Sequence, residues 1–175
     1  MIELESPQIE PVEELGTYAK YEAGPLQAGY GVTLGNALRR VLLSSLEGTA
    51  VTSIQIRDVY QEFSTIPGVK EDVTQIVLNV KRLRLKSFAA HPVQLRLTKS
   101  GAGPVLAADL VESADVEIVN PDLVLMTLDS DDVTIEMDLT VERGVGYLGA
   151  ERSEALPIGV IAVDAIFTPV RKVNY

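Results

Sequence analysis

The sequence predicts an α+β fold in which helices and antiparallel strands do not follow one another in a regular order. Two segments repeat apolar residues at helical spacing, whereas most others are β-branched or alternate apolar and polar residues. A doubly wound parallel sheet would require regular strand–helix alternation, which is absent. With 175 residues, 46% hydrophobic and 23% charged, the chain suits one domain or two small ones with a buried core.

The first predicted elements are a strand and a long helix. Residues 17–26 contain aromatic side chains and end at Gly-Pro, which is typical of a strand. Thr33 is the expected N-cap of a helix that ends near Glu47, and Gly48 suits the C′ position after it. One apolar stripe runs along this helix and comprises Leu34, Ala37, Leu38, Val41, Leu42, Ser45 and Leu46.

A second helix is predicted at residues 69–80, after a β-branched strand at 49–60 and a loop with a Pro-Gly turn. Glu71 and Asp72 lie near its start, where the helix dipole favours acidic side chains. Its apolar face comprises Val69, Val73, Ile76, Val77 and Val80.

The rest of the chain is predicted to be mostly β. Residues 82–86, 93–97 and 133–141 alternate in character, and shorter strand segments lie at 115–119 and 123–128. Residues 99–104 and 129–132 are predicted turns, and residues 148–157 a polar connection. The nearly continuous apolar run at 158–170 indicates a strand that is buried on both sides or lies in an interface.

The composition excludes several classes of function. There is no cysteine and a single histidine, His91, so we expect no disulfide, no metal site and no cofactor. A net charge of −10 argues against direct contact with nucleic acid, which requires clustered positive charge. No apolar run approaches 18 residues and the N-terminus lacks the features of a signal peptide, so we expect a cytoplasmic protein without a membrane segment.

A glycine-rich stretch leads into the first helix and raises the possibility of phosphate binding. Helix N-termini bind phosphate, but Gly29, Gly31 and Gly35 have the spacing G-x-G-x-x-x-G and no lysine follows. A free-standing nucleotide-binding or regulatory module is therefore the alternative function. The acidic pairs at 71–72 and 131–132 lie at a helix start and in a turn, where catalysis is not expected.

Basic residues on two segments are candidates for protein contacts. Asn36, Arg40, Leu43 and Glu47 form a second stripe on the first helix, which is either a solvated face or an interface in which arginine pairs with carboxylates. The run KRLRLK at residues 81–86 is either an edge strand protected by charge or a docking surface for an acidic partner.

Several long motifs resemble one family in colinear order. GYGVTLGNALRRVLLSSLEGTAV closely resembles the first helix of the bacterial RNA polymerase alpha subunit. EFSTIPGVKEDVTQIVLNVK, GPVLAADL, DVEIVNPD, VERGVGY and PIGVIAVDAIFTPVRKVNY resemble its later segments, so the resemblance covers essentially the whole chain.

The resemblance implies a non-catalytic assembly scaffold of RNA polymerase. It implies a homodimer with two subdomains, one formed by residues 1–48 plus 158–175 and the other an inserted β-rich part at 49–157. The beta subunit would bind Gly35, Asn36, Arg39, Arg40 and Leu43, and the beta-prime subunit would bind Lys81, Arg82, Val163 and Asp164. The dimer or core face of the helix would comprise Leu34, Leu38, Val41 and Leu42.

Three features depart from the family pattern. Gln61-Glu62-Phe63 stands where the family has His-Glu-Phe or His-Glu-Tyr, and Val145 stands where a basic residue is common. The chain stops at Tyr175, before the further helix, linker and DNA-binding domain of the family. We therefore expect a weak dimer and no direct contact with nucleic acid from these residues.

Overall fold

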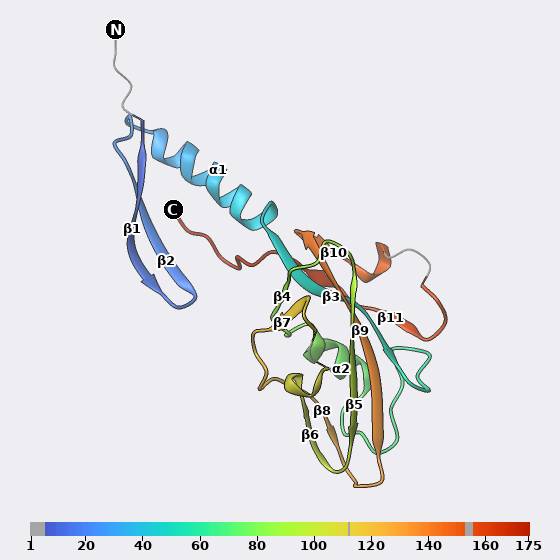
Figure 1. The fold of residues 1–175 in the computed structure, drawn as a ribbon. Helices are drawn as coiled ribbons and strands as arrows, with labels where there is room; N and C mark the ends of the chain where they lie inside the picture. Colours follow the sequence, from blue (N-terminus) through green and yellow to red (C-terminus); the bar gives the residue numbers. More distant parts are fainter. Residues whose placement is uncertain (1–5, 112, 153–155) are drawn as a thin grey trace.

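The computed structural model describes residues 6–111, 113–152 and 156–175. A four-stranded antiparallel sheet and a short helix form the body of the molecule, and a longer helix and an N-terminal hairpin project from one end of it (Figure 1). This mixture of helices and antiparallel strands confirms the predicted α+β class. Part of the predicted polar connection, residues 153–155, lies outside the described residues.

The N-terminal hairpin consists of β1 (Gln8–Leu15) and β2 (Tyr18–Gly24), joined at Gly16, which has a φ of 52°. The predicted strand at residues 17–26 corresponds to β2. Strand β1 was not predicted, because three of its eight residues are glutamates, Pro11 lies within it, and its apolar and polar residues do not alternate regularly. All eight of its residues are exposed.

Helix α1 (Tyr30–Ser44) begins and ends about three residues earlier than predicted. Gly29, with a φ of 84°, occupies the N-cap position in place of Thr33, and the Tyr30 N–H donates to the Gln27 carbonyl at 3.0 Å. At the other end Ser45 is the C-cap. The predicted C′ role of Gly48 is wrong, because the chain from Glu47 onward already pairs with another strand.

The central sheet has the order β11-β3-β9-β5, formed by β3 (Glu47–Ile56), β5 (Val93–Ser100), β9 (Thr134–Val145) and β11 (Val160–Ala162). All three neighbouring pairs are antiparallel. The predicted alternation in β5 and β9 is confirmed, because every second side chain is buried. The buried set in these two strands comprises Val93, Leu95, Leu97, Ile135, Met137, Leu139 and Val141.

Helix α2 (Val73–Val80) is shorter than the predicted helix. Asp72 caps it by accepting a hydrogen bond from the Gln75 N–H at 2.7 Å. Glu71 lies outside the helix, because its carboxylate accepts from the Thr127 N–H at 2.7 Å, and Val69 forms a bridge with Leu128. The buried residues of α2 are Val73, Ile76 and Val80, as the apolar pattern predicted.

Three small two-stranded sheets complete the body: β4 (Leu85–Ser87) with β7 (Val116–Ile118), β6 (Gly103–Leu106) with β8 (Val124–Leu128), and β10 (Tyr147–Leu148) with β12 (Ala165–Ile166). Single 3₁₀ turns lie at Ala107–Asp109 and Ala150–Arg152. The predicted strand at 82–86 is shorter, because Arg82 and Leu83 still donate to carbonyls of α2.

The predicted continuous strand at 158–170 is instead broken into β11 and β12. The chain changes partner between them, from β3 to β10, and the Val163 N–H donates to the Thr52 carbonyl at the break. Strand β11 shares the central sheet with β3, β5 and β9, so residues from both predicted subdomains lie in one sheet. The two-part division of the chain stays a prediction.

The chain after β12 crosses the central sheet over two glycines. Gly48 and Gly144 lie directly opposite each other on β3 and β9. A Cβ on Gly144 would lie 2.8 Å from the Phe167 ring, and one on Gly48 would clash with the Phe167 carbonyl group. The Phe167 N–H donates to the Gly146 carbonyl at 2.9 Å, and Phe167 is 6% exposed. The glycine pair therefore allows a close approach of backbone and ring.

Candidate partner-binding surfaces

Helix α1 displays the two arginines that the sequence singled out. Asn36, Arg39 and Arg40 are exposed, whereas Leu43 is half-buried. Among the residues that the structure describes, no carboxylate forms a salt bridge with either arginine. Both guanidinium groups are therefore free, within the described part of this chain, to pair with an acidic group on another molecule.

The apolar stripe of α1 is not covered by the described part of the chain. None of the residues of α1 is buried, and Leu38 and Val41 are 38% and 52% exposed. Leu34 and Leu42 are half-buried. The sequence predicted burial against the same subdomain or against a second copy. The described part of the single chain does not bury the stripe, and burial against a second copy stays a prediction.

Gly35 was predicted to contact a partner, but its surface is occupied by the chain itself. A Cβ on Gly35 would lie 2.8 Å from the Cβ of Tyr175. The tyrosine therefore lies against the helix at the glycine. Gly35 also lies inside α1 rather than in the loop before it, so it is not part of a phosphate-binding loop at the start of the helix.

A polar cluster brings together two of the four residues predicted to contact the second partner. The Lys81 ammonium lies 2.9 Å from the Asp164 carboxylate, although the two residues are 83 positions apart in sequence. The Ala150 N–H donates to the same carboxylate at 2.9 Å. These contacts connect the end of α2, the turn after β10 and the segment between β11 and β12.

The other two predicted residues differ in their exposure. Arg82 is exposed beside the cluster, and its carbonyl accepts from the Asn120 side chain at 3.1 Å. Val163 is 2% exposed, because its side chain belongs to the hydrophobic core. In this structure Val163 therefore has no surface to offer a partner. The sequence could not reveal which way the Val163 side chain points, because the apolar run around it has no clear period.

Sequence reasoning missed Tyr147 and Ala150, which complete the cluster. The hydrogen bond from the Ala150 N–H and the one from Lys81 lower the pKa of Asp164 to about 2, and burial opposes them. The same carboxylate raises the pKa of the Tyr147 hydroxyl. No local signal could have identified these contacts, because a backbone N–H and a tyrosine in a two-residue strand carry no distinctive pattern.

This pKa predicts a pH-dependent contribution of Asp164 to stability. The folded-state pKa is lower than the ordinary value of 3.8, so the contribution is fully present above pH 3.8 and is lost as the pH falls towards 2. The full shift corresponds to about 2.5 kcal/mol. The Asp164 side chain is 36% exposed, however, and solvent screens its interactions. We therefore expect its ionisation to stabilise the fold by about 1 kcal/mol.

The measurement is urea denaturation of the wild-type chain and of Asp164→Asn at a series of pH values from neutral to acidic. The variant should be less stable near neutral pH, and the difference should shrink as the carboxylate of the wild-type chain becomes protonated. A difference that stayed constant down to the acidic limit would mean that the ionisation of Asp164 does not stabilise the fold.

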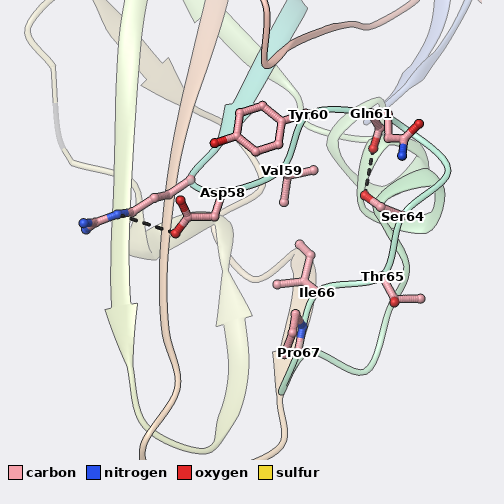
Figure 2. A pocket seen from close by; sticks show the side chains of 9 residues that line it. Asp58, Val59, Tyr60, Gln61, Ser64, Thr65, Ile66 and Pro67 are labelled. Carbon is pink, nitrogen blue, oxygen red and sulfur yellow. Dashed lines mark hydrogen bonds and ion pairs between the residues drawn. The ribbon is translucent and has the colours of Figure 1, made fainter.

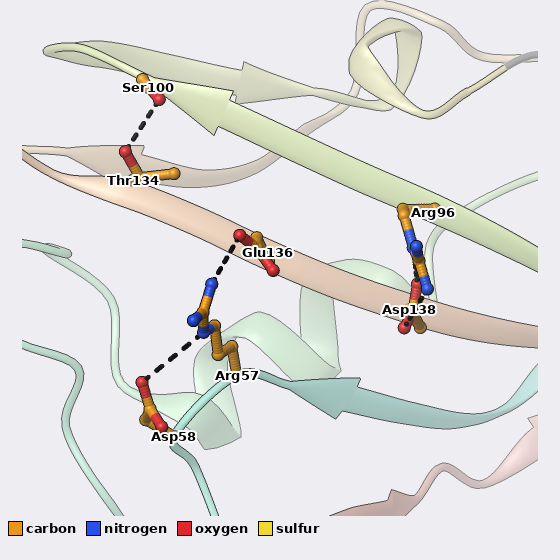
Figure 3. Close-up of polar contacts among 7 residues, drawn as sticks. All are labelled: Arg57, Asp58, Arg96, Ser100, Thr134, Glu136 and Asp138. Atoms are coloured by element: carbon orange, nitrogen blue, oxygen red, sulfur yellow. Dashed lines mark hydrogen bonds and ion pairs between the residues drawn. The ribbon is translucent and has the colours of Figure 1, made fainter.

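The outer face of the central sheet carries charges that are paired with one another (Figure 3). Arg96 binds Asp138 through two hydrogen bonds of 2.7 and 3.2 Å, and Arg57 binds Glu136 at 2.8 Å. The geometry of the Arg96 pair is bidentate, which is favourable for arginine and a carboxylate. This face therefore differs from α1, where both arginines lack such partners among the described residues.

A small pocket lies beside the loop that follows β3, and two aromatic residues of the loop point into solvent. The pocket has a volume of about 270 Å³, and Figure 2 shows Tyr60, Gln61, Ser64 and Ile66 at its edge. This volume is just below the usual lower limit for small-molecule sites, about 300 Å³. Tyr60 and Phe63 are 71% and 82% exposed. The loop is more suited to contact a protein than to enclose a ligand.

Catalytic or metal-binding arrangements were not expected from the sequence. Within residues 6–111, 113–152 and 156–175, no group of three or more histidine, aspartate or glutamate side chains is placed to hold a metal ion. In the same part of the chain, no helix has both the length and the apolar character that crossing a membrane would require.

Comparisons with known proteins agree with the resemblance found in the sequence. A family model described as "RNA polymerase Rpb3/RpoA insert domain" matches residues 54–168. Proteins named "DNA-directed RNA polymerase subunit alpha" from Roseiflexus sp. (strain RS-1), Roseiflexus castenholzii and Herpetosiphon aurantiacus are 58%, 56% and 54% identical over 175 residues. The matches cover 100% of this chain and 54%, 54% and 53% of the three relatives, so the chain spans about half of their length. The chain belongs to the RNA polymerase Rpb3/RpoA insert-domain family.

Proposed function

We propose that the chain is a non-catalytic assembly scaffold of a bacterial RNA polymerase in the cytoplasm. The proposal rests on α1. None of the 15 residues of this helix is buried, and its two arginines form no salt bridge with the described residues. The relatives of the chain are named as alpha subunits of DNA-directed RNA polymerase. A projecting helix of this kind suits contact with other protein chains.

The proposal assigns one surface to each of three partners. The beta subunit binds the face of α1 that carries Asn36, Arg39, Arg40 and Leu43, next to the Gly35–Tyr175 contact. The beta-prime subunit binds the body near Lys81, Arg82 and Asp164. A second copy of the chain covers the apolar stripe, which comprises Leu34, Leu38, Val41 and Leu42. In this arrangement residues 1–48 and 158–175 form one subdomain, and residues 49–157 form the other.

Arg40 provides the sharpest test of the beta-binding surface. We expect Arg40→Ala to change the free energy of unfolding by less than about 0.5 kcal/mol, because the side chain is exposed and forms no salt bridge with the described residues. Binding of the beta subunit should weaken by about 2 kcal/mol or more if Arg40 is a central interface residue. Arg40→Lys should restore little binding, because lysine lacks the planar guanidinium group.

The experiment is capture of purified beta subunit by the wild-type chain and its variants, each first checked by thermal melting. Arg96→Ala is the matched control, because it removes an exposed arginine from the outer face of the sheet rather than from α1. Equal capture by wild type and by a folded Arg40→Ala chain would contradict the assignment and leave α1 with a merely solvated polar face.

A further inference from the structure

The segment from Phe167 to Tyr175 contacts the sheet at one end and α1 at the other. Phe167 lies over the glycine pair of β3 and β9, and Tyr175 lies against Gly35 of α1. A Cβ on Gly35 would lie 2.5 Å from the Tyr175 Cγ and 2.8 Å from its Cβ. Figure 1 shows this segment leaving the sheet and running back beside the helix. We call residues 168–175 the strap.

Within the described residues of the single chain, α1 has few other contacts that fix its direction. None of its residues is buried, and only Ser45 and Leu46 separate its last residue, Ser44, from the first residue of β3. A helix attached at one end by a short connection can pivot about that end. Gly35 lies nine residues before Ser44, which corresponds to about 14 Å along the helix axis. A contact at that distance from the pivot restricts the direction of the whole helix.

The residue types at this contact fit such a role. Glycine inside a helix is unfavourable relative to alanine, because it loses more conformational freedom on folding. Gly35 has an ordinary negative φ, so the backbone conformation does not require glycine there. Its missing side chain leaves the space that the tyrosine ring occupies. The contact therefore explains why glycine occupies the interior of α1.

We propose that Tyr175, seated on Gly35, is a positioning residue that fixes the direction of α1 relative to the central sheet. The structural claim does not depend on the proposed scaffold function. Its consequence rests on that function: in each copy of the scaffold, the strap would set how the α1 surface is oriented relative to the surface on the body.

The test is a distance measurement by pulsed electron paramagnetic resonance within the 175-residue chain. The sequence has no cysteine, so Thr33→Cys on α1 and Thr98→Cys on β5, both exposed, give two unique labelling sites. The labelled chain is diluted into unlabelled chain, so that only distances within one molecule are recorded. We expect a narrow distance distribution in the otherwise unchanged chain and in Tyr175→Phe, which keeps the ring.

Tyr175→Ala and Gly35→Ala should each broaden the distance distribution or shift it by several ångströms. Tyr175→Ala removes the ring, and Gly35→Ala fills the space that the ring occupies. Asn174→Ala, an exposed neighbour in the strap, is the matched control and should leave the distribution narrow. Unchanged distributions in both Tyr175→Ala and Gly35→Ala, with unchanged thermal melts, would overturn the proposal. No polymerase subunit is present in this experiment, so its failure is distinct from failure of beta capture by Arg40 variants.

Discussion

Gly48→Ala is expected to destabilise the fold by more than about 3 kcal/mol, above the usual range of about 1–3 kcal/mol for an overpacked site. The added Cβ would clash with the carbonyl group of Phe167, whose carbonyl carbon lies 2.9 Å from the Cβ position. Both groups belong to the main chain or are attached directly to it, so no rotation of a side chain can relieve the clash. Either β3 or the segment after β12 must move.

The measurement is urea denaturation of the purified chain, with Gly31→Ala as the matched control. Gly31 lies in α1 with only Leu26, at 4.0 Å, near its Cβ position. Alanine should therefore be tolerated there or increase stability by up to about 1 kcal/mol. A loss of less than about 1 kcal/mol in Gly48→Ala would show that the two segments separate easily and that the close approach is unimportant to the fold.

Leu139→Ala is expected to cost about 2–5 kcal/mol, the range measured for buried leucines. Leu139 is 0% exposed on the central strand β9, with β3 on one side and β5 on the other. Strands on both sides hold the backbone in place, so the structure can close the resulting cavity only in part. Urea denaturation measures the free energy of unfolding of both chains. If the dependence of that free energy on urea concentration (the m-value) is the same, the loss of stability follows directly.

Leu38→Ala is the matched comparison, because it makes the same change on α1. Leu38 is 38% exposed, so we expect a loss below about 1 kcal/mol at concentrations where sedimentation shows a monomer. If a second copy covers the stripe, the same variant should weaken the dimer in sedimentation experiments. Equal losses in monomeric Leu38→Ala and Leu139→Ala would mean that α1 packs on its own chain, contrary to the structure.

These two leucines illustrate what the sequence could and could not predict about the fold. Periodicity identified both as members of an apolar face, and in β9 that face lies in the core, in one hydrophobic cluster with the buried residues of α2. In α1 the same kind of pattern predicted burial without saying which molecule provides the cover. Local patterns specify which face is apolar, whereas burial depends on contacts that are distant in sequence.

Gly48 shows a second limit of prediction from sequence. Local rules assigned it to a helix end, because glycine after an apolar helical stripe is common there. Its actual role depends on Phe167, more than a hundred residues later, and on Gly144 across the ladder. Such a crossing has no local signature. The position of the helix end was consequently misjudged by about three residues.

The candidate surfaces were predictable to different degrees. The helical spacing correctly placed Arg40 away from the most buried positions of α1, and the arginine is exposed. The resemblance brought Lys81 and Asp164 into one set before their contact at 2.9 Å was known. Neither approach anticipated that Val163 would be buried or that Tyr175 would cover Gly35. Those outcomes depend on how the returning chain packs after β11.

The N-terminal hairpin has a consequence for the tendency of the chain to aggregate. Among the described residues no third strand pairs with β1 or β2, and Ile9, Leu15 and Tyr21 are more than half exposed. Open strand edges of this kind favour aggregation of identical chains. Pro11, the adjacent irregularity in the ladder and the glutamates of β1 oppose it, because they remove a hydrogen-bond donor, bend the edge and repel a like-charged copy. The hairpin thus combines exposed strand edges with features that oppose their pairing with another copy of the chain.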